Sequence, residues 1–229
     1  MISRIQLTMC LGLTLIWLFQ VDQLCLLASS TPGLRHAAPR VETIAPVNLD
    51  QMAKAAGKIV IGRCLSATPQ FLSREMAGRL RLPGTGRIME YVFSIEQTLK
   101  GRKSQTIQFK QIHSLTGLNG QSLLHSMPHY EIGREYLLFL TQESEVGLCS
   151  PVGLFQGAFR LQQDKAGQVV ATNGNQNVGL FPQTTPLESR LKRQLTPLEK
   201  AYSAQGKGPL PVETLILATK EILKAARNQ

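Results

Sequence analysis

Alternation of apolar and polar residues predicts short β-strands in the middle of the chain. In 88–99, Met89 and Phe93 fall on one face, as a half-buried strand requires. The segment 105–112 alternates in the same way after a short basic turn, so the two segments are predicted to form a hairpin. The continuous apolar run 136–140 is typical of a central strand.

Three further segments complete the predicted sheet. The β-branched run 58–65 precedes the hairpin, and 152–162 and 168–172 follow the central strand. A mainly β fold results, and a small antiparallel barrel of five to six strands, like the oligonucleotide/oligosaccharide-binding (OB) barrel, is its simplest closure. The irregular segments 66–87 and 113–135 are predicted to be long loops.

Helical patterns appear only near the two ends of this region. Asn48 can cap a short helix over 49–56, and an amphipathic pattern predicts a helix over 212–228. We expect the apolar stripe of the second helix to pack on its own domain, with a partner groove as the alternative. The β-barrel domain is thus predicted over 48–181, and the Pro-, Thr- and Ser-rich stretch 182–211 is predicted to be a linker.

Residues 1–30 have the pattern of a secretory signal peptide. Arg4 precedes the apolar stretch 7–19, and small residues end the segment at Ser30. Cleavage near Ser30 would leave an extended leader over 31–47. The alternative is an uncleaved membrane anchor, for which the apolar stretch is short. We therefore predict a secreted or periplasmic protein that contacts a membrane only if this segment is retained.

Export changes the interpretation of the four cysteines. Cys10 and Cys25 leave with the signal peptide, so Cys64 and Cys149 remain as a pair in an oxidising compartment. We predict a disulfide between them, which would stabilise the fold by roughly 4–5 kcal/mol through loop closure. The alternative is a catalytic thiol, which requires a free cysteine and a paired histidine.

The chain is basic, with 25 Lys and Arg against 15 Asp and Glu and a net charge of +10. Such a surface attracts polyanions, acidic proteins or anionic lipids, although solubility alone is the simpler explanation. No nucleic-acid partner is expected for an exported protein. A basic loop is the candidate contact for a ligand or partner, and its residues are Arg74, Arg79, Arg81 and Arg87.

Three histidines are the best candidates for a metal site. His113, His125 and His129 lie in or beside one irregular segment, and three imidazoles can form an open zinc site. Pro128 interrupts the His-x3-His spacing that would suit a helix, so ordinary loop histidines are the alternative. We expect no cofactor.

Signatures of the common hydrolases are missing from the sequence. It contains no G-x-S-x-G, no H-E-x-x-H, no phosphate loop and no C-x-x-C. The carboxylate pairs Glu131/Glu135 and Glu143/Glu145 have the spacing of ordinary surface charges as much as that of a hydrolytic pair. The protein is therefore predicted not to be an enzyme.

Several short motifs occur in a fixed order. They are Leu99-Lys100-Gly101, then Pro128, Tyr130, Gly133, Glu135 and 137–140, then Gly153, Gln156, Gly157 and Phe159. In this order the chain resembles uncharacterised exported bacterial proteins with a small β-barrel, faintly like the barrel of the tissue inhibitors of metalloproteinases. Some of these proteins accompany secreted matrixin-type proteases. The chain lacks the N-terminal cysteine with which those inhibitors contact zinc, so the resemblance does not predict inhibition by that route.

Three functions are consistent with these patterns. The first is an exported, non-enzymatic module that binds another extracytoplasmic protein, with a secreted metalloprotease as the partner that the resemblance implies. The second is a binder of carbohydrate or of a polyanion in the cell envelope. The third is a hydrolase of a class that the sequence does not reveal.

Overall fold

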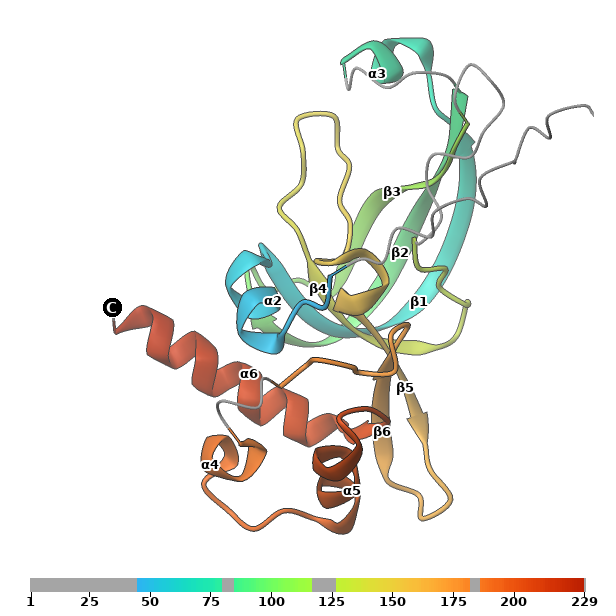
Figure 1. The fold of residues 1–229 in the computed structure, drawn as a ribbon. Helices are drawn as coiled ribbons and strands as arrows, with labels where there is room; N and C mark the ends of the chain where they lie inside the picture. The colour runs from blue at the N-terminus through green and yellow to red at the C-terminus, as the bar shows by residue number, and fades with distance from the viewer. Residues whose placement is uncertain (1–44, 80–84, 117–126, 182–185, 229) are drawn as a thin grey trace, which may run out of the picture. The chain divides into compact units, whose positions relative to one another are not determined.

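The computed structural model describes residues 45–79, 85–116, 127–181 and 186–228 (Figure 1). The strands are β1 (Lys58–Phe71), β2 (Thr85–Lys100), β3 (Thr106–Thr116), β4 (Glu135–Leu140), β5 (Ala158–Gln163), β6 (Val169–Asn173) and β7 (Leu210–Pro211). The helices are α2 (Leu49–Ala55), α3 (Arg74–Arg79), the 3-10 turn η1 (Leu154–Gly157), α4 (Leu187–Leu191), α5 (Pro197–Gln205) and α6 (Val212–Arg227). The predicted signal peptide, most of the predicted leader, Arg81 and His125 lie outside the described residues.

Seven strands form one antiparallel sheet in the order β3-β2-β1-β4-β5-β6-β7. The prediction of a mainly β, antiparallel fold is thus confirmed. The prediction of a five- to six-stranded barrel is wrong in strand number and in closure, because β5, β6 and β7 continue the sheet beyond β4. The predicted loop 66–87 is also much shorter, since residues 66–71 of β1 pair with residues 87–92 of β2.

The half of the sheet formed by β1 to β4 curls, so that one short segment forms backbone bridges to both β3 and β4. Residues 148–151 make a single parallel bridge to Lys110 of β3 and a single antiparallel bridge to Leu140 of β4. The pairing with β4 does not extend beyond this single bridge, in part because Pro151 has no N–H to donate. Register shifts in β1 increase the bend, and Gly62 allows a close approach, because a Cβ there would lie 2.3 Å from the carbonyl oxygen of Ser94.

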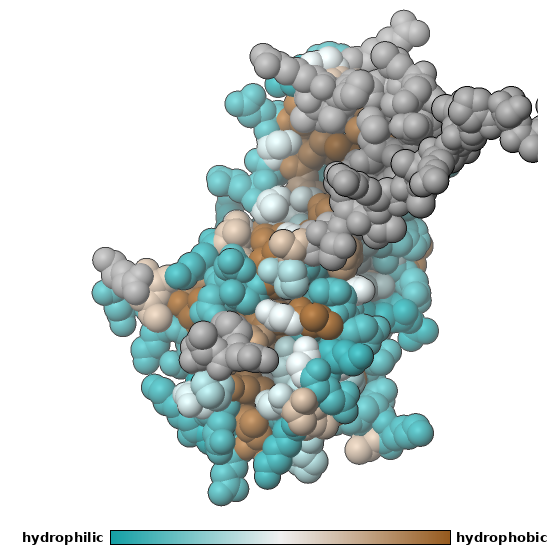
Figure 2. Space-filling view, in the orientation of Figure 1, coloured by the Kyte–Doolittle hydropathy of each residue, from teal (hydrophilic) through white to brown (hydrophobic). Residues whose placement is uncertain are grey.

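The two faces of the sheet carry two separate cores. The face inside the curl holds an aromatic cluster that we define by Tyr91, Phe93, Phe109, Tyr130 and Tyr136, together with Cys64 and Cys149. The other face holds a helix-covered cluster, to which α2, α4, α5 and α6 contribute buried side chains. On the side drawn in Figure 2, hydrophilic side chains cover most of the described surface, with apolar ones between them.

The predicted terminal helices form as expected. Asn48 begins α2 with a capping box, in which its side chain accepts a hydrogen bond from the N–H of Gln51. The apolar stripe of α6 packs on its own domain, where Leu215 and Ala218 are buried in the helix-covered cluster. Within the described residues, no helix is both long and apolar enough to cross a membrane.

The stretch predicted as a linker, 182–211, contains two helices in its described part, α4 and α5. A second capping box begins α5, where Thr196 and Glu199 exchange hydrogen bonds between side chain and backbone. The fully buried carboxylate of Glu199 also accepts hydrogen bonds from Arg193 and from the hydroxyl of Thr214 on α6. These contacts attach the stretch firmly to the rest of the fold.

Candidate functional site

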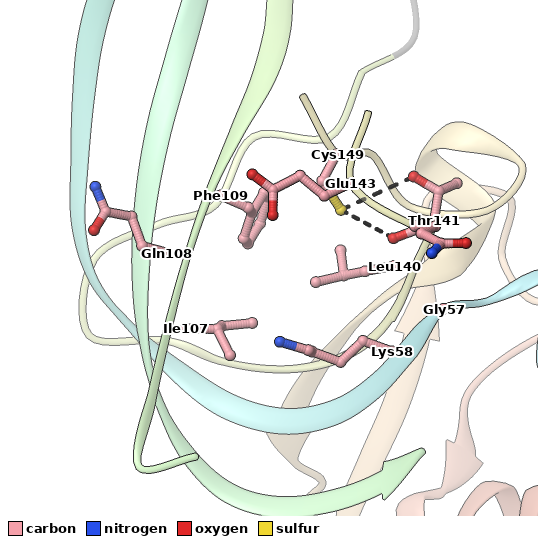
Figure 3. A pocket seen from close by; sticks show the side chains of 10 residues that line it. Gly57, Lys58, Ile107, Gln108, Phe109, Leu140, Thr141, Glu143 and Cys149 are labelled. Atoms are coloured by element: carbon pink, nitrogen blue, oxygen red, sulfur yellow. Dashed lines mark hydrogen bonds between the residues drawn. The ribbon is translucent and has the colours of Figure 1, made fainter. Parts of the chain in front are cut away.

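A pocket of about 310 Å³ opens at the end of the curled half of the sheet, where β1 begins and β4 ends (Figure 3). It is lined by Gly57, Lys58, Ile107, Gln108, Phe109, Leu140, Thr141, Gln142, Glu143 and Cys149. The register explains this grouping, because Lys58 pairs with Leu140 and Cys149 donates a backbone hydrogen bond to Lys110 on β3. Residues from three distant parts of the sequence therefore meet at one opening.

The floor of the pocket is apolar and its rim is polar. Ile107 and Phe109 point inward from β3 and are buried, while the intervening Gln108 is exposed, as strand alternation requires. Leu140 adds a third buried apolar side chain from the end of β4. A ligand here would bury its apolar part against this floor and meet polar groups at the rim.

Two opposite charges stand on opposite sides of this opening. Lys58 extends from the start of β1, and Glu143 comes from the segment after β4 (Figure 3). They form no ion pair with one another or with any other described residue. Both charges are therefore available to a ligand, the ammonium group to an acid and the carboxylate to a base.

The thiol of Cys149 lines the pocket but is not activated for nucleophilic attack. Burial raises its pKa, and the hydrogen bond with Thr141 counteracts that effect only in part. Its Sγ donates to the carbonyl oxygen of Thr141 at 3.3 Å, so the thiol is held in its protonated form. Burial likewise raises the pKa of Cys64.

The structure does not contain the predicted disulfide between Cys64 and Cys149. Both are buried free thiols of the aromatic cluster. Each makes its own local contact, since the Sγ of Cys64 lies 3.6 Å from the carbonyl oxygen of Ser66 while Cys149 contacts Thr141.

Two of the three predicted metal-ligating histidines lie together. The rings of His113 and His129 have centroids 5.9 Å apart, and the hydroxyl of Tyr91 lies 3.4 Å from Nδ1 of His129. His125 lies outside the described residues. Within the part of the chain that the structure describes, no three His, Cys, Asp or Glu side chains gather as metal ligands. The three-histidine site therefore stays a prediction.

Three of the four arginines of the predicted basic loop lie among the described residues. Arg74 and Arg79 lie at the two ends of α3, while Arg87 lies on β2 with its guanidinium 5.9 Å from the centroid of the Phe71 ring. Phe71 is 82% exposed, so this contact forms an exposed pair of a cation and an aromatic ring. None of these described residues lines the pocket of Figure 3.

The candidate carboxylate pair of a hydrolase is used in ion pairs. Glu131 accepts two hydrogen bonds from Arg160, and Glu135 pairs with Arg63. A general acid and a general base would both need an unpaired carboxyl in a cleft. The arrangement does not support hydrolytic chemistry by Glu131 and Glu135.

Comparison of the sequence with protein-family models gave no match, and comparison with curated proteins gave none either.

Proposed function

We propose that this chain is an exported, non-enzymatic binding module that recognises another extracytoplasmic protein through the pocket of Figure 3. The observation that carries the proposal is the combination of an apolar floor with two free, opposite charges at the rim. Pockets of this composition hold one anchoring apolar side chain, while the surrounding polar groups set its orientation.

The pocket suggests the chemistry of its occupant. An apolar side chain would fill the space over Ile107, Phe109 and Leu140, and its neighbours in the partner would place an acidic group near Lys58 and a basic group near Glu143. Such an arrangement of charges gives specificity and orientation more than affinity. A secreted metalloprotease, implied by the resemblance, is the first partner to test.

The environment of the reactive groups supports binding over catalysis. The thiols have raised pKa values, and the best-placed carboxylates outside the pocket are paired with arginines. An enzyme needs a nucleophile or base whose pKa is shifted toward the working pH. The pKa values of the two cysteines are raised, which is a shift away from neutral pH.

Export is the part of the proposal that the leader sequence supports. Expression of the full chain in a bacterium should deliver it outside the cytoplasm, with Thr31 as the first residue of the product. N-terminal sequencing of the extracytoplasmic fraction measures this directly. A full-length product in the cytosol would overturn the proposal of export.

Partner binding is tested by filling the pocket. Gln142 is exposed at the rim, and Gln142→Trp places an indole in the opening, whereas the matched control Gln163→Trp adds the same group on β5 away from it. The wild type and the control should retain the same protein from native extracytoplasmic fractions at high salt. We expect the Gln142→Trp variant to bind that protein at least about tenfold more weakly.

Two outcomes would overturn the pocket as the binding site. Equal retention by both tryptophan variants would place the contact elsewhere. Retention that disappears at moderate salt in all three proteins would indicate charge attraction instead of a specific interface.

A further inference from the structure

A second hollow, of about 440 Å³, lies beside the C-terminal half of α6 and is separate from the pocket of Figure 3. Leu99 of β2 and Leu223 of α6 provide its apolar lining, and the other lining residues are Lys220, Lys224, Arg227 and Asn228. The helix places the three cations on one side of the hollow, because they are spaced four and three residues apart.

The charge of this hollow has one sign. No acidic residue lines it among the described residues, and none of its three cations forms an ion pair with a described carboxylate. Lys224 and Arg227 belong to the last turn of α6, where the helix dipole favours positive charge. The cations are therefore stable there without a protein partner and remain available to an anion.

We propose that this hollow binds an acidic oligosaccharide. The three cations match carboxylate or sulfate substituents, and the leucines match the apolar face of a sugar ring. The Asn228 amide can exchange hydrogen bonds with a hydroxyl. No aromatic side chain lines the hollow among the described residues, so it offers no platform on which nucleobases could stack.

The shape argues against a lipid surface as the occupant. A flat bilayer meets protruding groups, whereas these cations lie along one side of a concavity. The apolar face of α6 is already buried in the helix-covered cluster, and the exposed Leu217 alone is too little apolar surface to insert the helix among lipids. This inference does not depend on the protein-binding pocket, since the two sites share no residue.

Calorimetric titration of the full chain with a heparin tetrasaccharide tests the site, with neutral maltotetraose as the ligand control. The site variant is Lys220→Gln/Lys224→Gln/Arg227→Gln. The control variant Lys165→Gln/Lys200→Gln/Lys207→Gln removes three exposed charges outside the hollow, so both variants carry the same net charge. We expect roughly tenfold weaker tetrasaccharide binding by the site variant and little change in the control. Both variants should keep the wild-type thermal midpoint.

Each other outcome would overturn the proposal. Equal weakening in the two variants would mean that net charge alone attracts the ligand. If maltotetraose bound as tightly as the heparin tetrasaccharide, the three cations would not contribute to binding. Binding to phosphatidylglycerol vesicles that only the site variant loses, without tetrasaccharide binding, would identify a lipid site. Absence of binding to either tetrasaccharide would exclude the site altogether.

Discussion

The curled half of the sheet, β1 to β4, and the half formed by β5 to β7 with the helices packed on it, which we call the helix-covered half, bury polar groups in different ways. In the helix-covered half, the side chain of Asn177 bonds to the backbone of Ala171, Asn173 and Gly208, and the hydroxyl of Tyr202 donates to the carbonyl of Asn177. Two buried atoms there are exceptions, the hydroxyl of Thr219 and Nε of Arg190. In the aromatic cluster of the curled half, the hydroxyl of the large, buried Tyr130 has no partner among the described residues.

This difference suggests that the helix-covered half has a structural role, whereas the curled half is free to bind a partner. Buried polar groups that are fully bonded specify one arrangement of the chain, because any alternative leaves them without partners. The curled half is held mainly by apolar and aromatic contacts, and it opens into the pocket of Figure 3. Removal of polar groups should therefore cost stability in the first half and little in the second.

The largest expected effect is in the helix-covered half, at Arg193. Arg193→Ala would leave the buried carboxylate of Glu199 without its ion pair and should destabilise the fold by about 3 kcal/mol. Urea unfolding measures this change. Arg102→Ala, at an exposed turn position, is the control and should change stability by less than about 0.5 kcal/mol. Equal effects of the two substitutions would contradict the structural role of Glu199.

Acid should weaken the same region. Burial alone would raise the pKa of Glu199, but hydrogen bonds from Arg193, Thr214 and Thr196 outweigh it and lower the pKa to about 2. Since the folded protein holds this proton less tightly than the unfolded chain, its contribution to stability is complete above about pH 4.5 and is lost as the pH falls toward 2. Unfolding midpoints over this range should fall for the wild type and fall less steeply for Glu199→Gln.

A pair of tyrosine substitutions compares the two halves directly. Tyr130→Phe removes an unpartnered hydroxyl and should stabilise the fold by about 1 kcal/mol, whereas Tyr202→Phe breaks a bond and should destabilise it by about 1 kcal/mol. Both changes keep the aromatic ring, so differences in packing are small. Destabilisation by Tyr130→Phe would show that this hydroxyl has a partner, and the two halves would then not differ in this respect.

The smallest effect concerns thiol reactivity in the curled half. Alkylation followed by peptide mass spectrometry should find Cys64 and Cys149 unmodified in the folded protein at neutral pH and fully modified after unfolding. During slow labelling, Cys149 should react before Cys64, because it is 8% exposed and Cys64 is 0% exposed. Recovery of the two cysteines as one linked peptide would contradict the free thiols of the structure.

Much of the fold could be predicted because its signals are local. Alternation at Met89, Tyr91 and Phe93 specified the buried face of β2, and Asn48 marked the start of α2. The helices of 186–205 escaped prediction because their composition is that of a loop. The signal that could have revealed α5 was present, since Glu199 follows Thr196 at capping-box spacing.

The pocket could be predicted only in part. The sequence shows Glu143 as one of a pair of closely spaced carboxylates, but nothing local indicates that it faces Lys58 across a hollow. The curl that brings them together depends on bulges in β1 and on single bridges from Leu148 and Pro151. Such contacts join residues that are distant in sequence, so no local pattern encodes them.

By itself the sequence determined which residues are buried in strands, where the outer helices begin and that the surface is basic, because side-chain period, capping and charge are properties of neighbouring residues. Only the tertiary structure decided that the sheet stays open, that Cys64 and Cys149 remain separate thiols and that two hollows form. These features depend on the bending of long strands and on where their ends meet, and those are set by the packing of the whole sheet.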